Sequence, residues 1–350
     1  MMINAAIVAY GLSGRVFHAP FLHTHPKFNL TKVVERNKEE SLKRYPYVDI
    51  VRSIDELLTD EMLDLVVITS PNTTHYEFAK QALEAGKHVV IEKPFTVTSQ
   101  EAKELGRLAD KKGKILSVYQ NRRWDGDFLT VKHIVKNKML GDLVDFESHF
   151  DRFQPLQADQ WREKNLPGSG VLYDLGAHLI DQTIDLFGLP HSLTAEIKSQ
   201  REKAEVDDFF DIRLHYRTHT ATLKSSMIVK TLGPRFVLHG TKGSYKKYGI
   251  DPQEELLDSG EFPDSPAYKK AIESDQWGQI ETEWNGMAIK GKIQNVYGNY
   301  TSYYDDIYQA IKENKKPIVT ADQAYKTIWL IEQMQKSSEE KRTIFLEGID

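Results

Sequence analysis

Two groups of polar residues have the types and spacing needed for acid–base chemistry. The first is the pair Glu92 and Lys93, which follows the apolar run Val89 to Ile91 and precedes Pro94. The run is predicted to be a short buried strand, and proline ends it because it cannot donate a backbone hydrogen bond. Ligands bind at the carboxyl ends of strands in an open parallel sheet, so both charged side chains should face a ligand. A solvated strand end with an ordinary turn would explain the same residues.

The second group lies in a segment that becomes helical after two glycines. Asp174, His178 and Asp181 are four and then three residues apart, which places them on one face of a helix. A histidine between carboxylates is suited to proton transfer near neutral pH. Two other interpretations stay open: a structural role with Asp174 as a helix cap, and a divalent metal site.

A glycine turn near the N-terminus begins the elements that would position these groups. The predicted strand Ile3 to Tyr10 breaks at Gly11-Leu-Ser-Gly14, before the helical segment Arg15 to His23. The dinucleotide fingerprint G-x-G-x-x-G uses glycines here because backbone amides approach a pyrophosphate at a helix N-terminus. Ala9 replaces the first glycine, whereas the second and third are present. The residues expected to contact the cofactor are Tyr10, Gly11, Leu12, Ser13 and Gly14.

The next apolar run, Leu30 to Val34, ends at Glu35 and Arg36. These residues follow the glycines by about twenty positions, where an acid binds the adenosine ribose hydroxyls. An arginine there could instead accommodate a 2′-phosphate or lie against adenine. The expected cofactor is therefore NAD or NADP, with a slight preference for NAD because a carboxylate at Glu35 would repel a 2′-phosphate. A surface Glu–Arg pair would also fit.

Strand and helix patterns then alternate, which predicts a parallel sheet covered on both faces. The expected strands are Asp64 to Thr69, His88 to Ile91 and Ile115 to Tyr119, and the expected helices are Thr73 to Ala85 and Ser99 to Lys112. The turn after the first of these strands should meet the cofactor through Ser70, Pro71, Asn72 and His75, while Thr73 or Thr74 caps the helix.

Beyond Tyr119 the pattern changes to long runs of period two, which indicate a large, mainly antiparallel sheet. The expected fold class is α/β, with a doubly wound domain at residues 1–122 and an α+β domain at residues 123–350. Helices are expected at 128–138, 176–186, 305–312 and 322–336, the second of them covering part of the sheet. Strands are expected around 144–150, 210–216, 220–229, 236–239 and 342–346, whereas 251–292 should form loops and irregular strands.

Composition limits the partners. A chain of 350 residues favours two domains, and its net charge of -5 offers little to a phosphate backbone. We therefore expect no nucleic-acid partner. No stretch has the length of a membrane span, and zero cysteines exclude disulfides and thiolate metal sites. A cytoplasmic location is expected.

Together the motifs resemble those of the glucose-fructose oxidoreductase, inositol dehydrogenase and MocA (Gfo/Idh/MocA) family. The resemblance covers nearly the whole chain, and its specific part is Glu-Lys-Pro at 92–94 combined with Asp-x-x-x-His at 174–178. It implies a Rossmann domain, a C-terminal sheet that often mediates oligomers, a nicotinamide cofactor and a sugar or cyclitol substrate. The stretch 119–125 is most similar to the scyllo-inositol dehydrogenase branch. The resemblance also suggests a cis bond between Lys93 and Pro94.

By match to these motifs, Lys93 would be the catalytic lysine and Asp174 and His178 its partners, in a dehydrogenase acting on CH–OH groups. Lys93 would stabilise the developing alkoxide, and His178 would act as general acid and base, although Lys93 could also pass the proton. The alternative is a non-catalytic nicotinamide-binding sensor on the same fold. We expect a polyol substrate, a homodimer or higher homo-oligomer formed through the C-terminal sheet, and no metal. Substrate hydroxyls are expected to meet Asn121, Arg122, Arg162 and Tyr173, with Arg123 and Trp161 as further polar or aromatic neighbours.

Overall fold

The computed structural model describes residues 2–157, 163–271 and 276–346, and the chain forms two compact units. Unit 1 contains Met1–Trp124, Pro252–Ile272 and Asn299–Lys326, and unit 2 contains Asp125–Asp251, Glu273–Gly298 and Thr327–Asp350. The first change of unit lies close to the expected boundary at residue 122. The chain then returns to unit 1 twice, so a single boundary does not describe its compact units.

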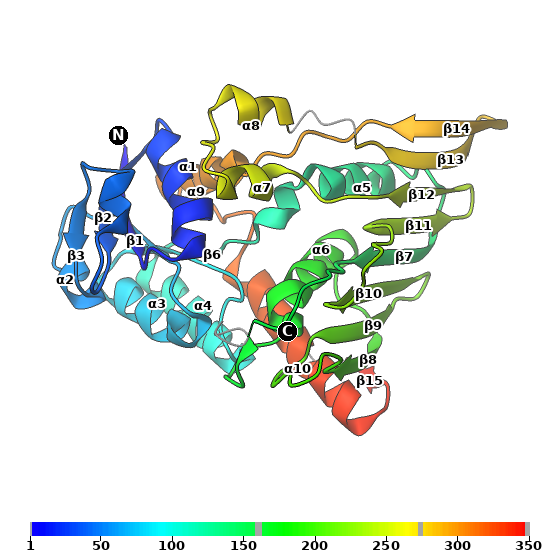
Figure 1. Cartoon of the computed structure of the whole chain (residues 1–350), viewed down its shortest axis with the longest axis horizontal. Coiled ribbons are helices and arrows are strands. Elements are labelled where there is room, and N and C mark those ends of the chain that lie inside the picture. Colours follow the sequence, from blue (N-terminus) through cyan, green and yellow to red (C-terminus); the bar gives the residue numbers. More distant parts are fainter. Residues whose placement is uncertain (1, 158–162, 272–275, 347–350) are drawn as a thin grey trace. The chain divides into compact units, whose positions relative to one another are not determined.

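Unit 1 is built on a six-stranded parallel sheet with the order β3-β2-β1-β4-β5-β6 (Figure 1). Its strands are β1 (Ile3–Val8), β2 (Phe28–Val34), β3 (Asp49–Val51), β4 (Leu65–Ile68), β5 (His88–Ile91) and β6 (Leu116–Val118). The central strands are short apolar runs because helices cover both faces of such a sheet. The strand order reverses between β1 and β4, which is where ligands bind in doubly wound sheets. The predicted parallel sheet is confirmed.

Helices cover the sheet of unit 1, with α1 and α9 on one side of it and α3 and α4 on the other in Figure 1. Their bounds are α1 (Ala19–Thr24), α2 (Ile54–Leu58), α3 (His75–Glu84), α4 (Ser99–Lys112), α7 (Gln253–Asp258), α8 (Pro266–Ala271) and α9 (Thr301–Glu313). Helix α4 has the predicted bounds because a capping box of Thr98 and Glu101 begins it and Gly113, with φ of 61°, ends it.

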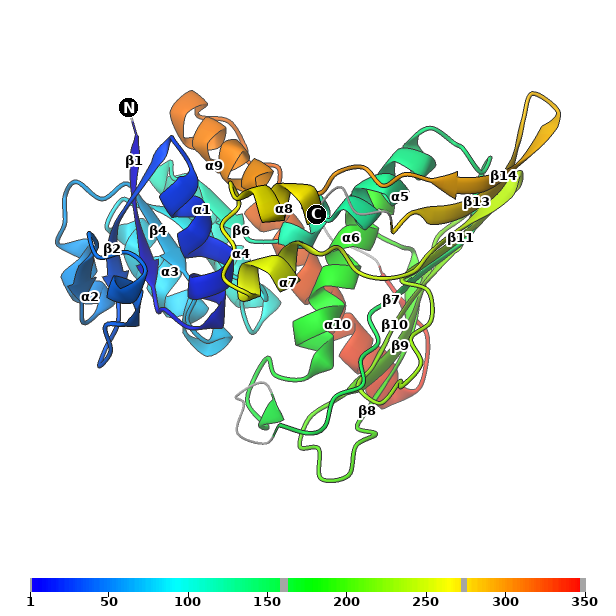
Figure 2. The same cartoon turned by 45° about the horizontal axis from the view of Figure 1, so that its top comes forward.

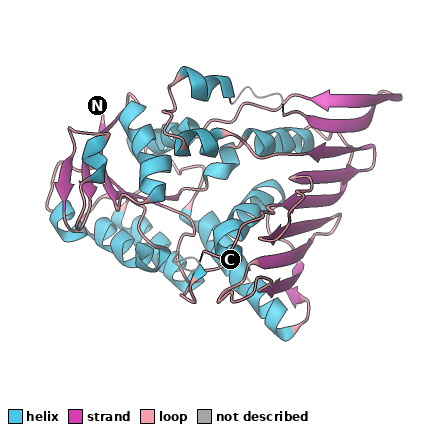
Figure 3. Ribbon diagram, in the orientation of Figure 1, coloured by secondary structure: helices cyan, strands magenta, loops and turns pink. Residues whose placement is uncertain are grey.

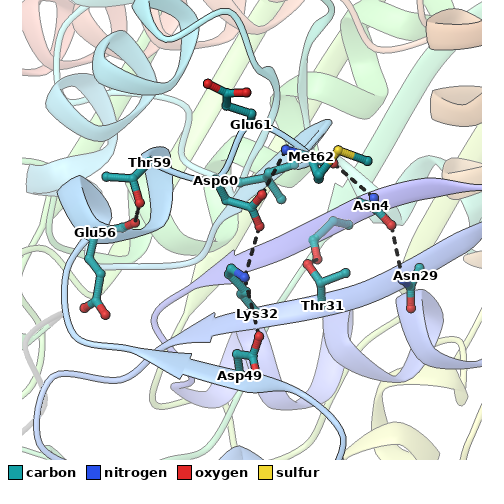
Figure 4. Close-up of polar contacts among 12 residues, drawn as sticks. Asn4, Asn29, Thr31, Lys32, Asp49, Glu56, Thr59, Asp60, Glu61 and Met62 are labelled. Carbon is teal, nitrogen blue, oxygen red and sulfur yellow. Dashed lines mark hydrogen bonds and ion pairs between the residues drawn. The ribbon is translucent and has the colours of Figure 1, made fainter.

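A polar network joins the strands at the amino end of this sheet, opposite the expected ligand edge (Figure 4). The side-chain nitrogen of Asn4 donates to the Met62 carbonyl at 3.0 Å, and the side-chain oxygen of Asn4 accepts from the Asn29 side chain at 3.1 Å. Lys32 lies 3.0 Å from Asp60 and 3.4 Å from Asp49. The hydrogen bond to Asp60 raises the pKa of Lys32, so the ammonium group keeps its charge.

Unit 2 is built on a nine-stranded sheet with the order β14-β13-β12-β11-β7-β10-β9-β8-β15 (Figure 3). β7 and β10 run parallel, and the other neighbouring pairs are antiparallel, as predicted for the C-terminal half. The strands are β7 (Leu143–His149), β8 (Ser192–Lys198), β9 (Phe209–His215), β10 (Thr220–Ser226), β11 (Phe236–Gly240), β12 (Gly243–Lys247), β13 (Gly278–Trp284), β14 (Met287–Ile293) and β15 (Ile344–Phe345).

Helices cover one face of this sheet, as Figure 2 shows. They are α5 (Gly126–Lys136), α6 (Ala177–Phe187) and the later part of α10 (Ala321–Glu340). The inward residues Phe146, Phe210 and Leu214 are fully buried. The expected cover by the helix at 176–186 is therefore confirmed. Within the described part of the chain, no helix is long and apolar enough to cross a membrane.

The prediction of loops and irregular strands at 251–292 is wrong. This region contains α7, α8 and the regular hairpin of β13 and β14, which pair from Gly278 with Ile293 to Trp284 with Met287. The two helices have six residues each, too few to show a helical period. Strand β14 is exposed on both faces over most of its length, so its sequence shows no alternation of apolar and polar residues.

Candidate active site

The glycine turn after β1 contains an alanine in the left-handed conformation. Ala9, at the first fingerprint position, has φ of 77°. The hydroxyl of Thr69 donates to the carbonyls of Ala9 and Val8, at 2.6 and 3.1 Å, and stabilises this turn. Gly14 must lack a side chain because a Cβ there would lie 2.6 Å from the Ala9 carbonyl oxygen. The turn thus keeps the fingerprint geometry without its first glycine.

Gly11, at the second fingerprint position, is exposed, and the packing of the chain gives no reason for a glycine there. A Cβ added to it would meet no atom within 4 Å. In dinucleotide-binding turns, a glycine at this position lets the backbone approach a phosphate closely. The turn and the π-helical segment that follows it, Gly14–His18, therefore fit a pyrophosphate.

Glu35, expected to contact the ribose, bonds to its own loop. One carboxylate oxygen accepts from the Ser41 amide and hydroxyl at 2.9 and 2.6 Å, and the other accepts from the Glu40 amide at 3.0 Å. Arg52 holds the same loop by donating to the carbonyls of Glu35 and Lys38. The Glu35 side chain is buried, and sequence reasoning had no local signal for this capping role.

The Arg36 side chain is exposed at the end of β2, and two further arginines lie near the glycine turn. Arg15 pairs with Asp258 at 3.1 Å. Arg44 donates to the Gly260 carbonyl at 2.6 Å and stacks on Phe262. Burial raises the pKa of the Tyr10 hydroxyl, and the positive charges of Arg44 and Arg15 act against that rise. Charges of both signs, including those of Glu35 and Glu40, therefore lie around the turn.

His75, expected to contact the cofactor, is buried and joins two loops. Its Nε2 lies 2.9 Å from the Ser70 carbonyl oxygen, and its Nδ1 lies 2.9 Å from that of Pro94. Burial lowers the pKa of His75, and these carbonyl oxygens partly offset that effect. The ring thus holds the loops after β4 and β5 together. Pro71 is exposed beside it, while Asn72 is buried.

The following helix has the predicted N-cap residue, but its side chain does not cap the helix. Thr74 occupies the N-cap position of α3, but its side chain makes no capping hydrogen bond. Its hydroxyl donates to the Pro71 carbonyl at 2.7 Å and lies 2.7 Å from the Ser70 hydroxyl oxygen. The short 3-10 helix Asn72–Thr74 before α3 changes the geometry that a threonine cap requires.

Glu92 is a buried carboxylate with donors from three places in unit 1. The Ser13 hydroxyl and the His18 Nε2 group bond to one oxygen, the latter at 2.9 Å, and the Lys93 amide donates to the other at 2.9 Å. On the far side of the ring, His18 Nδ1 lies 2.6 Å from the Tyr304 hydroxyl. Sequence reasoning named Ser13, Glu92 and Lys93 and missed His18 and Tyr304.

The burial of Glu92 alone would raise its pKa. The His18 hydrogen bond, the Ser13 hydroxyl and the charge of Lys93 outweigh this effect, and the pKa of Glu92 is lowered. The carboxylate is therefore ionised at neutral pH. The Lys93–Pro94 bond next to it is cis, as predicted.

Two of the residues expected to bind substrate hydroxyls, Asn121 and Arg122, belong to unit 1 and are buried. The Arg122 guanidinium pairs with Glu254 at the start of α7. Arg123 lies 3.2 Å from the Gln323 side-chain oxygen. Arg162 and Trp161 lie outside the described residues.

Unit 2 carries the acid–histidine group. Asp174 and Tyr173 lie in the π-helical turn Leu172–Gly176, and His178 and Asp181 follow on α6. Tyr173, His178 and Asp181 are buried, and Asp174 is half-buried. The expected helical segment is confirmed. Its first turn is π-helical and therefore wider than the α-helical turn that the sequence spacing implied.

Asp207, which precedes β9, anchors this turn. Its carboxylate accepts from the Leu172 amide at 2.7 Å, and its carbonyl accepts from the Val171 amide at 2.9 Å. Gly170, with φ of 92°, packs against the same carboxylate, where a Cβ would lie 2.1 Å from an oxygen. Burial raises the pKa of Asp207 to about 6.

The structure brings the cofactor-side residues together within unit 1 through the contacts of Ser13, Thr69, His75 and Glu92. Lys93 belongs to unit 1, whereas Asp174 and His178 belong to unit 2. Among the described residues, no three or more acidic or histidine side chains are arranged to hold a metal ion. The metal alternative at Asp174, His178 and Asp181 therefore has no support in their geometry.

Two family models match the chain. One, described as an oxidoreductase family with an NAD-binding Rossmann fold, matches residues 3–120, and the other, the C-terminal alpha/beta domain of an oxidoreductase family, matches residues 132–346. Scyllo-inositol 2-dehydrogenase (NADP(+)) IolW of Bacillus subtilis is 41% identical over an alignment of 353 positions that covers 99% of this chain and 96% of that protein. D-glucoside 3-dehydrogenase of Escherichia coli is 28% identical over 54% of this chain and 55% of its own length.

Solved structures agree with these matches. The oxidoreductase YvaA of Bacillus subtilis has a TM-score of 0.94 at 40% identity, covering 99% of each chain. An oxidoreductase of Bacteroides fragilis has a TM-score of 0.90 at 44% identity, covering 99% of this chain and 100% of its own. Since the family models cover both halves of the sequence, this chain belongs to the Gfo/Idh/MocA family of oxidoreductases.

Proposed function

We propose that this protein is an NADP-dependent dehydrogenase that transfers a hydride between the cofactor and a secondary hydroxyl of an inositol or a similar polyhydroxylated ring. The observation that carries the proposal is the edge of the unit 1 sheet, where an open glycine turn and the Glu92–Lys93 strand end are tied together by Ser13. Family membership supports the cofactor class. The relative named as a scyllo-inositol 2-dehydrogenase supports the substrate class.

The chemistry divides among three residues. The nicotinamide cofactor accepts or returns the hydride when it is bound. The Lys93 ammonium group stabilises the negative charge that develops on the substrate oxygen, because a cation at a desolvated strand end acts strongly on an alkoxide. His178 takes the hydroxyl proton, and Asp174 orients its ring. Lys93 remains a second candidate for the proton transfer.

The preference for NADP replaces the slight preference for NAD drawn from the sequence. That preference rested on repulsion between the Glu35 carboxylate and a 2′-phosphate, and this carboxylate is turned to its own loop, where it accepts three hydrogen bonds from Glu40 and Ser41. Arg36 and Lys38 are exposed beside it and carry the opposite charge. A 2′-phosphate would gain charge-assisted hydrogen bonds at such a place.

The substrate class rests on polar side chains. Tyr173, Asp174 and His178 present three kinds of hydrogen-bonding group within six residues of unit 2. Unsatisfied hydroxyls in a desolvated site cost about 1 to 3 kcal/mol each, so a polyol needs such groups. We also assign Asn121 and Arg122 to substrate hydroxyls.

We further propose that the chain assembles as a homodimer or a higher homo-oligomer through the sheet of unit 2. Its hairpin exposes apolar side chains that a monomer would leave in water, namely Trp284, Met287 and Ile289.

Turnover of a substrate panel tests the proposal. Purified protein is incubated with NADP⁺ or NAD⁺ and with scyllo-inositol, myo-inositol, glucose, xylose or a simple secondary alcohol, and reduced cofactor is followed by absorbance. We expect the highest kcat/KM with an inositol and NADP⁺. Lys93→Met should retain cofactor binding and lower turnover by about a hundredfold or more. Saturable cofactor binding without turnover on any polyol would favour the sensor instead.

A further inference from the structure

A buried chain of three side chains, Tyr304, His18 and Glu92, has no part in the chemistry proposed above. All three are at most 7% exposed, and they come from the start of α9, the π-helical turn after the glycine motif, and the end of β5. They meet at hydrogen-bonding distances of 2.6 Å for the first pair and 2.9 Å for the second.

The direction of each hydrogen bond follows from the chemistry of its partners. An ionised carboxylate can only accept, so the His18 Nε2 atom carries a proton and donates it to Glu92. At Nδ1 a neutral ring accepts from the Tyr304 hydroxyl, and a charged ring donates to it. Burial raises the pKa of Tyr304 well above 10, so this hydroxyl keeps the proton that it donates. In both cases the two hydrogen bonds fix the orientation of the His18 ring.

The Glu92 carboxylate is the end of this chain and the meeting point of two functional loops. It accepts from the hydroxyl of Ser13, within the glycine turn, and from the amide of Lys93. A buried carboxylate is rarely the most stabilising choice for packing alone, because desolvation disfavours it. Its retention here is better explained by the groups it holds in place.

We propose that His18 and Tyr304 are positioning residues for the cofactor site. They hold Glu92 in the orientation in which its two oxygens fix the glycine turn and the Lys93 backbone relative to each other before the cofactor binds. Such pre-organisation raises affinity because less ordering is left to the binding step. The inference rests on the proposed function and adds residues that bind neither the phosphates nor the substrate.

Tyr304→Phe tests this role, and Tyr303→Phe is the matched control. The two tyrosines are neighbours on α9 and fully buried, but the Tyr303 hydroxyl donates to Ser117 Oγ at 2.9 Å and takes no part in the chain. Dissociation constants for NADPH and NADH are measured by intrinsic fluorescence, together with the melting temperature of each cofactor-free variant. A kcat pH profile with the best polyol completes the comparison.

We expect similar melting temperatures for the two variants and a dissociation constant about tenfold higher for Tyr304→Phe alone. The acidic limb of its pH profile should move to higher pH because the His18 ring that donates to Glu92 is no longer held by the Tyr304 hydroxyl. If Tyr304→Phe does not fold, His18→Gln and His18→Leu are compared instead. The glutamine amide can still donate to Glu92, so His18→Gln should bind the dinucleotide more tightly than His18→Leu.

Wild-type affinity in Tyr304→Phe, or equal weakening in both tyrosine variants, would overturn the positioning role while leaving the proposed function intact. A wild-type protein that binds neither dinucleotide would overturn the proposed function and this inference with it.

Discussion

Gly11 and Gly14 share one turn, but the chain requires them for different reasons. At Gly14, a Cβ would lie 2.6 Å from the Ala9 carbonyl oxygen and 2.9 Å from Thr69 Oγ1, so Gly14→Ala should lower the free energy of unfolding by about 1 to 3 kcal/mol. At Gly11 the added methyl group meets no protein atom. Gly11→Ala should therefore leave stability nearly unchanged and weaken dinucleotide binding, as measured by urea unfolding and fluorescence titration.

Equal loss of stability in both variants would show that Gly11 has a packing role. Unchanged cofactor affinity in Gly11→Ala would remove this turn from the cofactor site.

Ala9 offers a second test of the same turn. An alanine at φ of 77° pays a conformational penalty that glycine avoids, although glycine also increases the entropy of the unfolded chain. Ala9→Gly restores the full fingerprint and should raise the free energy of unfolding by about 0.5 kcal/mol. A lower stability than the wild type in thermal unfolding would mean that the Thr69 hydroxyl already removes the penalty.

Arg36 and Glu35 separate the two cofactors. Arg36→Ala should weaken NADPH binding by about tenfold, because one charge-assisted hydrogen bond is lost, and should leave NADH binding nearly unchanged. Glu35→Gln serves as the neighbouring control and should change the stability of the loop more than the NADPH-to-NADH ratio. If the NADPH-to-NADH ratio of dissociation constants changes in Glu35→Gln and not in Arg36→Ala, Glu35 and not Arg36 reads the ribose.

At the scale of elements, the π-helical turn Leu172–Gly176 depends on Asp207, whose pKa of about 6 makes its anchor sensitive to pH. This pKa lies above the ordinary value of 3.8, so the fold favours the protonated carboxyl. The resulting stability is complete below pH 3.8 and is lost as pH rises through about 6. Asp207→Asn removes this dependence.

Unfolding free energies of wild type and Asp207→Asn should therefore diverge between pH 4 and 7, with the wild type losing on the order of 2 kcal/mol relative to the variant. Parallel curves over this interval would show that Asp207 has an ordinary pKa.

Most elements could be predicted because their signals are local. The alternation of apolar runs and helical patterns identified the sheet of unit 1, and glycines and caps set the ends of α4. Glu92 and Lys93 were recognisable because they stand at the end of a buried strand. Tyr304 could not be recognised in this way, because it lies more than two hundred residues from its partner His18 and no local sequence pattern indicates that contact.

Glu35 and His75 show what the sequence does not predict, namely the hydrogen-bonding partner of a side chain. Both occupy positions where a cofactor contact is expected, and both also satisfy backbone groups of their own unit. Residue type and spacing identify the edge of the sheet at which a side chain lies. They do not identify which hydrogen-bonding partner it meets there, because nearby amides and carbonyls compete with a ligand.

At the scale of the whole molecule, the chain passes between two units and places the lysine in one and the acid–histidine group in the other. Assembly through unit 2 can be measured separately from activity. Light scattering should give a mass that is a multiple of the 40.2 kDa chain, and Met287→Lys with Ile289→Lys should lower it. A monomer mass in the wild type at micromolar concentration would contradict the proposed assembly.

The most direct test of the account follows the hydrogen atom itself. The protein is incubated with NADP⁺ and scyllo-inositol deuterated at its ring carbons, and the reduced cofactor is analysed by mass spectrometry. Deuterium should appear in the reduced cofactor, the deuterated substrate should react more slowly, and Lys93→Met should slow the transfer by about a hundredfold or more while still binding NADPH. Reduced cofactor without deuterium, or undiminished transfer in Lys93→Met, would contradict the account.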